Sequence, residues 1–364
     1  MKLIDNLRYK SLDLFLGASF FNRFKDTFYK LHLGHNKIIG WEDSLPVRTL
    51  GVPAEYSDAS IDSIVRLYNS QRYHLYYPSI ASLSITDQCD CSCAHCGAYG
   101  EKGDDLPTKE WIRVIKEATD LGVFSFLLVG GEPLMREDLP EIIKAIDRKR
   151  AVCLLYTNGS MLKERVKELY DAGLRRVLVS IYHAEENIHD EYCGQKGLMR
   201  KAMEGIEIAR QMRMLVGIST ISSPERLNSG ILERILYFSQ QRHANEIAIF
   251  NALPIGRWEN REDIRNPTQE YQANLKNLIT SWWAKPDAPG VWWYDYIASP
   301  QNCGCLGGTA MFHVSHSGEF RSCAFCKLTI GSVKNTDLLT LWTKLSDMTK
   351  RERNNMQGCW LINR

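Results

Sequence analysis

The residues of this chain best suited to chemistry are its eleven cysteines, because thiolates bind metals and act as nucleophiles. Most of them lie in two dense groups, which are Cys89, Cys91, Cys93 and Cys96, and then Cys303, Cys305, Cys323, Cys326 and Cys359. Only Cys153 and Cys193 lie between the groups. This distribution indicates two metal sites rather than a disulfide framework.

Three cysteines of the first group, Cys89, Cys93 and Cys96, have the spacing C-x3-C-x2-C. Three thiolates on one tight loop can hold three irons of a [4Fe–4S] cube and leave the fourth iron open for an exogenous ligand. The extra cysteine, Cys91, is expected to point away from such a cube. The alternative is a tetrahedral zinc site shared with the second group through Cys323-x2-Cys326.

The elements that would position this loop begin near residue 81, where apolar runs alternate with helical stripes. The runs predict buried parallel strands at 82–86, 123–129, 152–157, 175–182, 215–221 and 246–251. Because parallel strands need right-handed crossovers, residues 81–256 are predicted to form an α/β fold, a partial (β/α)6 TIM-like barrel. Loops that follow the strands build the active sites of such barrels, and Cys89 lies on one of them.

Residues 1–80 are predicted to form a mostly helical N-terminal extension. Phe21, Phe24, Phe28 and Leu31 recur at helical spacing, which predicts an amphipathic helix packed on the main domain. Basic residues flank that stripe, so weak membrane-surface contact and docking of a peptide or protein substrate are the alternatives.

Residues 257–364 are predicted to form a separate C-terminal module. His313–Cys323 is expected to form a hairpin that turns at Ser317-Gly318, with His313 and His316 exposed on it. This hairpin would place the cysteines near both of its ends beside one another, which suits a metal site.

The bulk composition excludes several classes of protein. A formal net charge of +2 and the lack of a dense Lys/Arg block argue against nucleic acid as a partner. No apolar segment is long enough to span a bilayer, and the N-terminus lacks the features of a signal peptide. The expected location is therefore the cytoplasm, where thiols stay reduced.

The first cysteine group and the residues that follow it resemble the radical S-adenosylmethionine (SAM) superfamily. The chain reads TDQCDCSCAHCGA, with His95 just before the third cysteine, and Gly130-Gly131-Glu132-Pro133 follows the next predicted strand. The resemblance implies that Gly130, Gly131 and Glu132 hold the methionine amino group of SAM. Less specific matches are Asn158 in a TNG turn and Ser180 at a strand end, both expected near SAM.

Two positions depart from the pattern of the superfamily. Relatives often carry an acidic residue and an arginine where this chain has Tyr182 and Cys193. Their roles cannot be carried over, so both residues are expected to face the substrate. The Cys193 thiol would be placed to return a hydrogen atom to a substrate radical; an unremarkable buried cysteine is the alternative.

The second cysteine group resembles the SPASM module or its shorter twitch form. Cys305 and Cys323 frame the pattern C-x12-G-x4-C, and Cys326 follows two residues later. The twitch form implies one auxiliary [4Fe–4S] cluster, with Cys305, Cys323, Cys326 and Cys359 as ligands. Cys303 or the substrate competes for the fourth place, and a zinc knuckle is the alternative.

Together these resemblances imply an enzyme that reductively cleaves SAM to a 5′-deoxyadenosyl radical and abstracts a hydrogen atom from a C–H bond. The expected substrate is a ribosomally made peptide that is crosslinked, epimerised or oxidised. Dehydrogenation or rearrangement of a small-molecule or lipid intermediate is the alternative, and a non-catalytic iron–sulfur or zinc protein is the alternative of another class. Flavodoxin or ferredoxin would supply the electron.

Overall fold

The computed structural model describes residues 34–35, 37–73, 76–265, 267–299 and 302–353. The predicted amphipathic helix near Phe21 and the cysteine Cys359 lie outside these residues. Among the described residues, none of the helices has the length and apolar character that crossing a membrane requires.

Six parallel strands form the middle of a ten-stranded sheet, as the sequence predicts. They are β3 (Ile80–Ser84), β4 (Ser125–Val129), β5 (Val152–Thr157), β6 (Arg176–Ser180), β7 (Leu215–Ser222) and β8 (Glu246–Asn251). The predicted bounds of β5 and β8 agree with the structure, whereas β6 is shorter than expected. Large apolar side chains fill the space between these strands and the surrounding helices.

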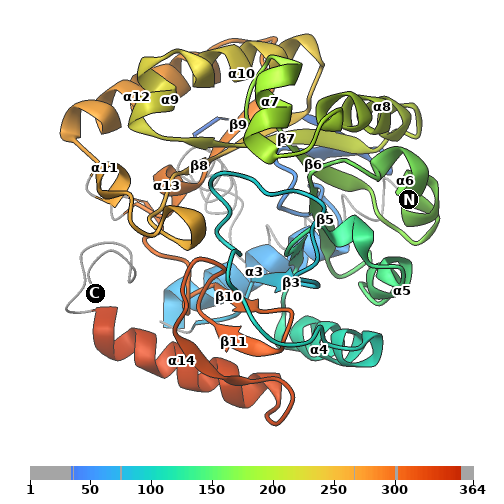
Figure 1. Cartoon of the computed structure of the whole chain (residues 1–364). Coiled ribbons are helices and arrows are strands. Elements are labelled where there is room, and N and C mark those ends of the chain that lie inside the picture. The colour runs from blue at the N-terminus through green and yellow to red at the C-terminus, as the bar shows by residue number, and fades with distance from the viewer. Residues whose placement is uncertain (1–33, 36, 74–75, 266, 300–301, 354–364) are drawn as a thin grey trace.

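Further strands from beyond residue 257 extend both ends of this sheet. β9 (Gly290–Trp293) pairs parallel with β8, and β10 (Met311–Val314) pairs parallel with β3. β11 (Glu319–Arg321) and β12 (Thr329–Ser332) continue the sheet as antiparallel strands. Cys323 and Cys326 lie on the loop between them. The large, mostly parallel sheet curves around an interior as in a partial barrel, with helices on its outer side (Figure 1).

The helices connect the strands. They are α3 (Asp58–Tyr73), α4 (Thr108–Leu121), α5 (Leu139–Lys144), α6 (Leu162–Asp171), α7 (Glu186–Cys193), α8 (Leu198–Gln211), α9 (Pro224–Asn228), α10 (Ile231–Gln241), α11 (Glu262–Arg265), α12 (Gln269–Trp283), α13 (Tyr294–Ile297) and α14 (Leu338–Arg353), with 3-10 turns η1 (Pro133–Met135) and η2 (Gly256–Trp258). Gly122 ends α4 in the left-handed conformation, with φ 104°, which glycine adopts more easily than any other residue.

The N-terminal segment closes the amino end of the barrel. A hairpin of β1 (Gly40–Glu42) and β2 (Leu45–Val47) precedes α3, so the described part of this extension is not only helical. Val47 and Leu50 pack against the inward side chains of Leu154 and Leu178. This packing fills the end of the barrel that lies opposite the loops after the strands.

The expectation that His313 and His316 are exposed is wrong, because each side chain is 2% exposed. The β10–β11 hairpin packs on β3 and on the loop after Cys96. His313 Nδ1 lies 3.1 Å from Ser82 Oγ, and His316 Nε2 donates to the Gly103 carbonyl. Burial lowers the pKa of His313 to about 3.

Candidate functional site

The first cysteine group lies on the loop between β3 and α4, at the carboxyl end of the sheet. Cys89 is exposed, and Cys93 and Cys96 are half-buried. Among the described residues, these three thiols do not gather within 4.8 Å of one another, as the ligands of a single zinc ion would. Nor do Cys93 and Cys96 gather in this way with Cys323 and Cys326, whereas Cys89, Asp90 and Cys91 do. The sulfur ligands of a multi-iron cube lie farther apart than those of a single zinc ion.

The expectation that Cys91 points away from this site is wrong. Its Sγ lies 3.0 Å from Gln195 Oε1, and Asn158 Nδ2 donates to it at 3.1 Å. Hydrogen bonds with the thiols of Cys89 and Cys93 raise the pKa of Cys91. Cys91 therefore joins the metal loop to the turns after β5 and α7.

Gly130 and Gly131 let the turn after β4 approach the cysteine loop. Gly131 N donates to Thr86 O at 2.8 Å, and Glu132 N donates to Gln88 O at 2.7 Å. A Cβ on Gly131 would lie 2.2 Å from Gln88 O, so only glycine fits. The glycines thus hold the two loops together through backbone contact.

Glu132 is buried and binds the neighbouring turn. Its carboxylate accepts hydrogen bonds from Leu134 N at 2.9 Å, Thr157 Oγ1 at 2.6 Å and Asn158 N at 2.6 Å. Burial raises its pKa to about 7. A carboxylate has about four acceptor positions, so one is left for the cation of a ligand.

Sequence reasoning missed Asp90, which lies inside the cysteine loop. Its carboxylate accepts hydrogen bonds from Asn158 Nδ2 at 2.7 Å and Gln195 Nε2 at 3.2 Å. Burial alone would raise its pKa, but the hydrogen bonds from Asn158 and Gln195 help to lower it. Nothing in the spacing of these residues marks them, since they come from three separate loops.

His95 lies in a box of aromatic rings. Its ring centroid is 4.3 Å from that of Tyr182, 5.3 Å from Tyr192 and 5.8 Å from Trp258. Within the described part of the chain, His95 Nδ1 and Tyr192 Oη are buried without a hydrogen-bond partner. Buried polar atoms are rarely left unpaired. A nucleotide carries ring nitrogens and hydroxyls that pair with such atoms, so these residues fit SAM.

Tyr182 and Ser180 lie beside this box at the end of β6. Burial raises the pKa of the Tyr182 hydroxyl well above its usual value. Arg226, which sequence reasoning also missed, is 5% exposed and donates to the Tyr182 carbonyl. Its guanidinium also lies 5.5 Å from the centre of the Tyr192 ring. Cys193 is 1% exposed and lies against the cysteine loop.

The second cysteine group surrounds the β10–β11 hairpin. Cys323 and Cys326 are buried, pack on Met311 and form a tight turn in which Cys326 N donates to Cys323 O. Gly307 lies close to the Ser322 carbonyl, which brings the segment after Cys305 beside that turn. The described ligand candidates therefore come from segments that lie together.

Five half-buried aromatic side chains, named here the aromatic wall, lie between the interior of the barrel and the second cysteine group. They are Tyr156, Phe250, Trp292, Tyr294 and Phe325. Phe250 lies 6.4 Å from Tyr156, 5.5 Å from Trp292 and 6.4 Å from Phe325, between ring centroids. Tyr294 and Phe325 pack on Cys323 and Cys326.

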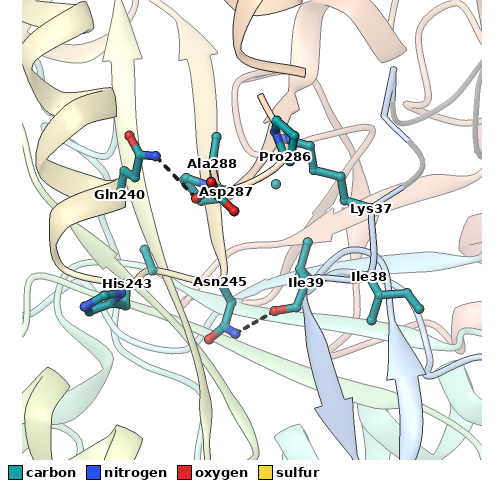
Figure 2. A pocket seen from close by; sticks show the side chains of 12 residues that line it. Lys37, Ile38, Ile39, Gln240, His243, Asn245, Pro286, Asp287 and Ala288 are labelled. Carbon is teal, nitrogen blue, oxygen red and sulfur yellow. Dashed lines mark hydrogen bonds between the residues drawn. The ribbon is translucent and has the colours of Figure 1, made fainter. Parts of the chain in front are cut away.

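A cavity of about 280 Å³ lies elsewhere, where β8 and β9 begin (Figure 2). Lys37, His243, Asn245 and Asp287 line it, and Asn245 Nδ2 donates to Ile39 O. Barrel active sites lie at the opposite ends of the strands, so this cavity is not part of the site.

Comparisons with known proteins agree with this geometry. Residues 83–223 match the model of the radical SAM superfamily. The AdoMet-dependent heme synthase of Oleidesulfovibrio alaskensis is 26% identical over 285 residues, 71% of this chain and 73% of the relative. The PqqA peptide cyclase of Bradyrhizobium diazoefficiens is 27% identical over 262 residues, 68% of this chain and 66% of the relative.

Solved structures of similar fold include Streptococcus suis SuiB bound to the precursor peptide SuiA, with a TM-score of 0.59 and 16% identity. The match covers 78% of this chain and 69% of SuiB. Native anSMEcpe with bound AdoMet has a TM-score of 0.57 and 17% identity, over 74% of this chain and 82% of that protein. The chain belongs to the radical SAM superfamily, where its homologues are SPASM-domain enzymes, and it is a radical SAM enzyme with SAM and a [4Fe–4S] cluster as cofactors.

Proposed function

We propose that this enzyme modifies a peptide at an unactivated C–H bond. Cys89, Cys93 and Cys96 would hold the SAM-binding cluster. When bound, the cluster would supply the one electron that cleaves SAM to methionine and a 5′-deoxyadenosyl radical, which would leave as 5′-deoxyadenosine after taking a hydrogen atom from the substrate. The chain's own residues position SAM and exclude water from this step.

Five other residues would bind SAM at the carboxyl end of the barrel. Glu132 faces its ammonium group with the one acceptor position left, and Gly131 holds that turn against the metal loop. Asn158 follows β5, Ser180 is the last residue of β6, and His95 would offer its unpaired Nδ1. Tyr182 packs on His95 and would separate SAM from the substrate.

The aromatic wall is the observation that carries the peptide assignment. Its rings give the interior an apolar lining that suits an amino-acid side chain, and apolar walls keep stray hydrogen donors from a radical. The relatives include a PqqA peptide cyclase, and SuiB of the same fold was solved with a precursor peptide. Crosslinking, epimerisation or oxidation are the reaction types that fit.

The second cysteine group would hold an auxiliary [4Fe–4S] cluster through Cys305, Cys323, Cys326 and Cys359. Cys303 or the substrate is the alternative to Cys359 as the fourth ligand of this cluster. Tyr294 and Phe325 lie between this group and the interior, so an electron left on a substrate radical would have a short route to the cluster.

The experiment that tests this function uses the anaerobically reconstituted full chain, SAM and dithionite, with short peptides encoded beside its gene. The expected result is a mass change in one peptide together with faster release of 5′-deoxyadenosine. Flavodoxin or ferredoxin should replace dithionite. If no peptide is changed and a small molecule accelerates the release instead, the small-molecule alternative is correct.

The affinity for SAM is expected to fall at low pH because of Glu132. Its pKa of about 7 means that the carboxylate loses its charge as the pH falls from 8 to 6. Since the SAM ammonium group pairs with the charged form, the Kd should rise roughly fivefold over this range, because protonation of the SAM amine, whose pKa is about 8, offsets part of the loss. Calorimetric titration of the reconstituted protein with SAM measures it.

Two variants decide whether Glu132 is the cause. Glu132→Gln should bind SAM weakly with a flat pH profile. Glu246→Gln is the matched control, because Glu246 is also buried with a pKa of about 7 but lies at the amino end of the barrel against Leu50 N. A pH slope that survives in Glu132→Gln would show that another group carries it.

A further inference from the structure

Cys91 is the cysteine of the first group that the proposed function leaves without a role. Its side chain and that of the neighbouring Asp90 contact the same two residues from other parts of the chain. Asn158 lies in the turn after β5, and Gln195 follows α7; both are half-buried, as is Cys91. Four hydrogen bonds join these side chains, and we name the set Asp90, Cys91, Asn158 and Gln195 the loop clamp.

The directions of the four hydrogen bonds are mutually consistent. Asn158 Nδ2 carries two hydrogens and donates to Asp90 Oδ1 at 2.7 Å and to Cys91 Sγ at 3.1 Å. The Cys91 thiol in turn donates to Gln195 Oε1 at 3.0 Å. Gln195 Nε2 donates to Asp90 Oδ2 at 3.2 Å, which closes a ring of donors and acceptors. Each polar group of the ring is therefore used once as its chemistry allows.

The loop clamp connects the cysteine loop to Glu132. Cys91 N donates to Cys89 Sγ at 3.4 Å, so the clamp lies directly against one of the proposed cluster ligands. Asn158 N donates to Glu132 Oε2 at 2.6 Å. Before Cys89 in the chain, the carbonyl of Gln88 accepts from Glu132 N at 2.7 Å. The segment that carries Cys89 is thus tied to Glu132 on both sides of the cysteine.

We infer that Asp90, Cys91 and Gln195 are positioning residues for SAM, because they fix the cysteine loop relative to the carboxylate that receives its ammonium group. The inference rests on the proposed function, in which Cys89 binds the cluster and Glu132 binds SAM. A ligand that must reach the open iron and Glu132 together binds tightly when the two are already held in place, since no ordering is then needed on binding. Cys91 acts here through hydrogen bonds and not as a ligand of iron.

The test compares Cys91→Ala with Cys91→Ser in the anaerobically reconstituted full chain, titrated calorimetrically with SAM. Alanine removes both side-chain bonds of Cys91, so the Kd for SAM should rise roughly fivefold. Serine can accept from Asn158 and donate to Gln195, so its Kd should stay within about twofold of wild type. Cys153→Ala, which removes a buried thiol on β5, is the control and should not change the Kd. Iron content should equal that of wild type in all three variants.

Gln195 supplies an independent variant, because it lies outside the cysteine loop. Gln195→Leu removes the bonds to Cys91 and Asp90 at similar side-chain size, and it should also raise the Kd roughly fivefold. Because both residues act in one ring, the effects of Gln195→Leu and Cys91→Ala should not multiply in the double variant. At saturating SAM, release of 5′-deoxyadenosine should stay close to the wild-type rate, since the loss is one of SAM affinity.

Three results would contradict this inference. The first is an unchanged Kd in both Cys91→Ala and Gln195→Leu. The second is a Cys91→Ser variant that binds SAM as weakly as Cys91→Ala, because the hydrogen bonds would then not be what matters. The third is a loss of iron in both Cys91 variants, which would make Cys91 a cluster ligand. A wild-type protein whose EPR signal does not respond to SAM would instead refute the proposed function itself.

Discussion

Replacing Cys93 by alanine is expected to reduce the release of 5′-deoxyadenosine to the level of a protein-free control. Without this thiolate the cluster lacks one of three ligands on its loop, and the cofactor supplies the chemistry that the protein cannot. The measurement is chromatographic detection of 5′-deoxyadenosine after anaerobic reaction with dithionite and SAM. Iron content should fall from about eight to about four atoms per chain, as for the loss of one [4Fe–4S] cluster.

Two further cysteine variants serve as controls for Cys93→Ala. Cys153→Ala should keep both the iron and the activity, because its thiol lies on β5 and packs into the core. Cys323→Ala should also lose about four irons but keep the SAM-dependent EPR signal, since it belongs to the second group. Release of 5′-deoxyadenosine by Cys93→Ala at the wild-type rate would refute the assignment of the first cluster.

Replacing Arg176 by methionine is expected to lower the free energy of unfolding by about 3–5 kcal/mol, the usual cost of breaking a buried charge network. Arg176 is 1% exposed at the start of β6. It donates to Glu42 Oε2 at 2.7 Å and to the carbonyls of Leu50 and Val52 at 2.9 and 2.6 Å. Methionine keeps most of the volume but leaves the Leu50 and Val52 carbonyls without this donor, and among the described residues Glu42 then pairs only with Arg148.

Urea denaturation of the apoprotein, followed by circular dichroism, measures this loss as a lower midpoint at unchanged slope. Lys167→Ala is the control, because its pair with Asp171 at 3.0 Å is exposed on α6 and should contribute about 0.5 kcal/mol or less. An equal effect of the two substitutions would mean that the N-terminal segment does not depend on Arg176 to close the barrel.

The N-terminal segment at the amino end of the barrel is connected to the candidate SAM site through strand β6. β6 carries Arg176 at its first residue and Ser180 at its last, so the same strand holds the N-terminal segment at one end and the SAM site at the other.

Much of the candidate site could be predicted because its signals are local. The spacing of Cys89, Cys93 and Cys96 lies within one loop, and the apolar runs of β5 and β8 mark their own bounds. Glycines at Gly131 and Gly122 mark places where a side chain or a normal φ does not fit. In each case the physical cause acts between residues a few positions apart.

The tertiary structure alone decided which distant side chains meet. Ser92 and Cys193 are far apart in sequence, and the hydrogen bond from Ser92 N to the Cys193 carbonyl depends on α7, a short helix without a strong pattern that returns onto the metal loop. The burial of His313 likewise depends on β10 joining the edge of the sheet next to β3. The direction of a side chain and its partner across two elements follow from how those elements pack, and no spacing within one element encodes that.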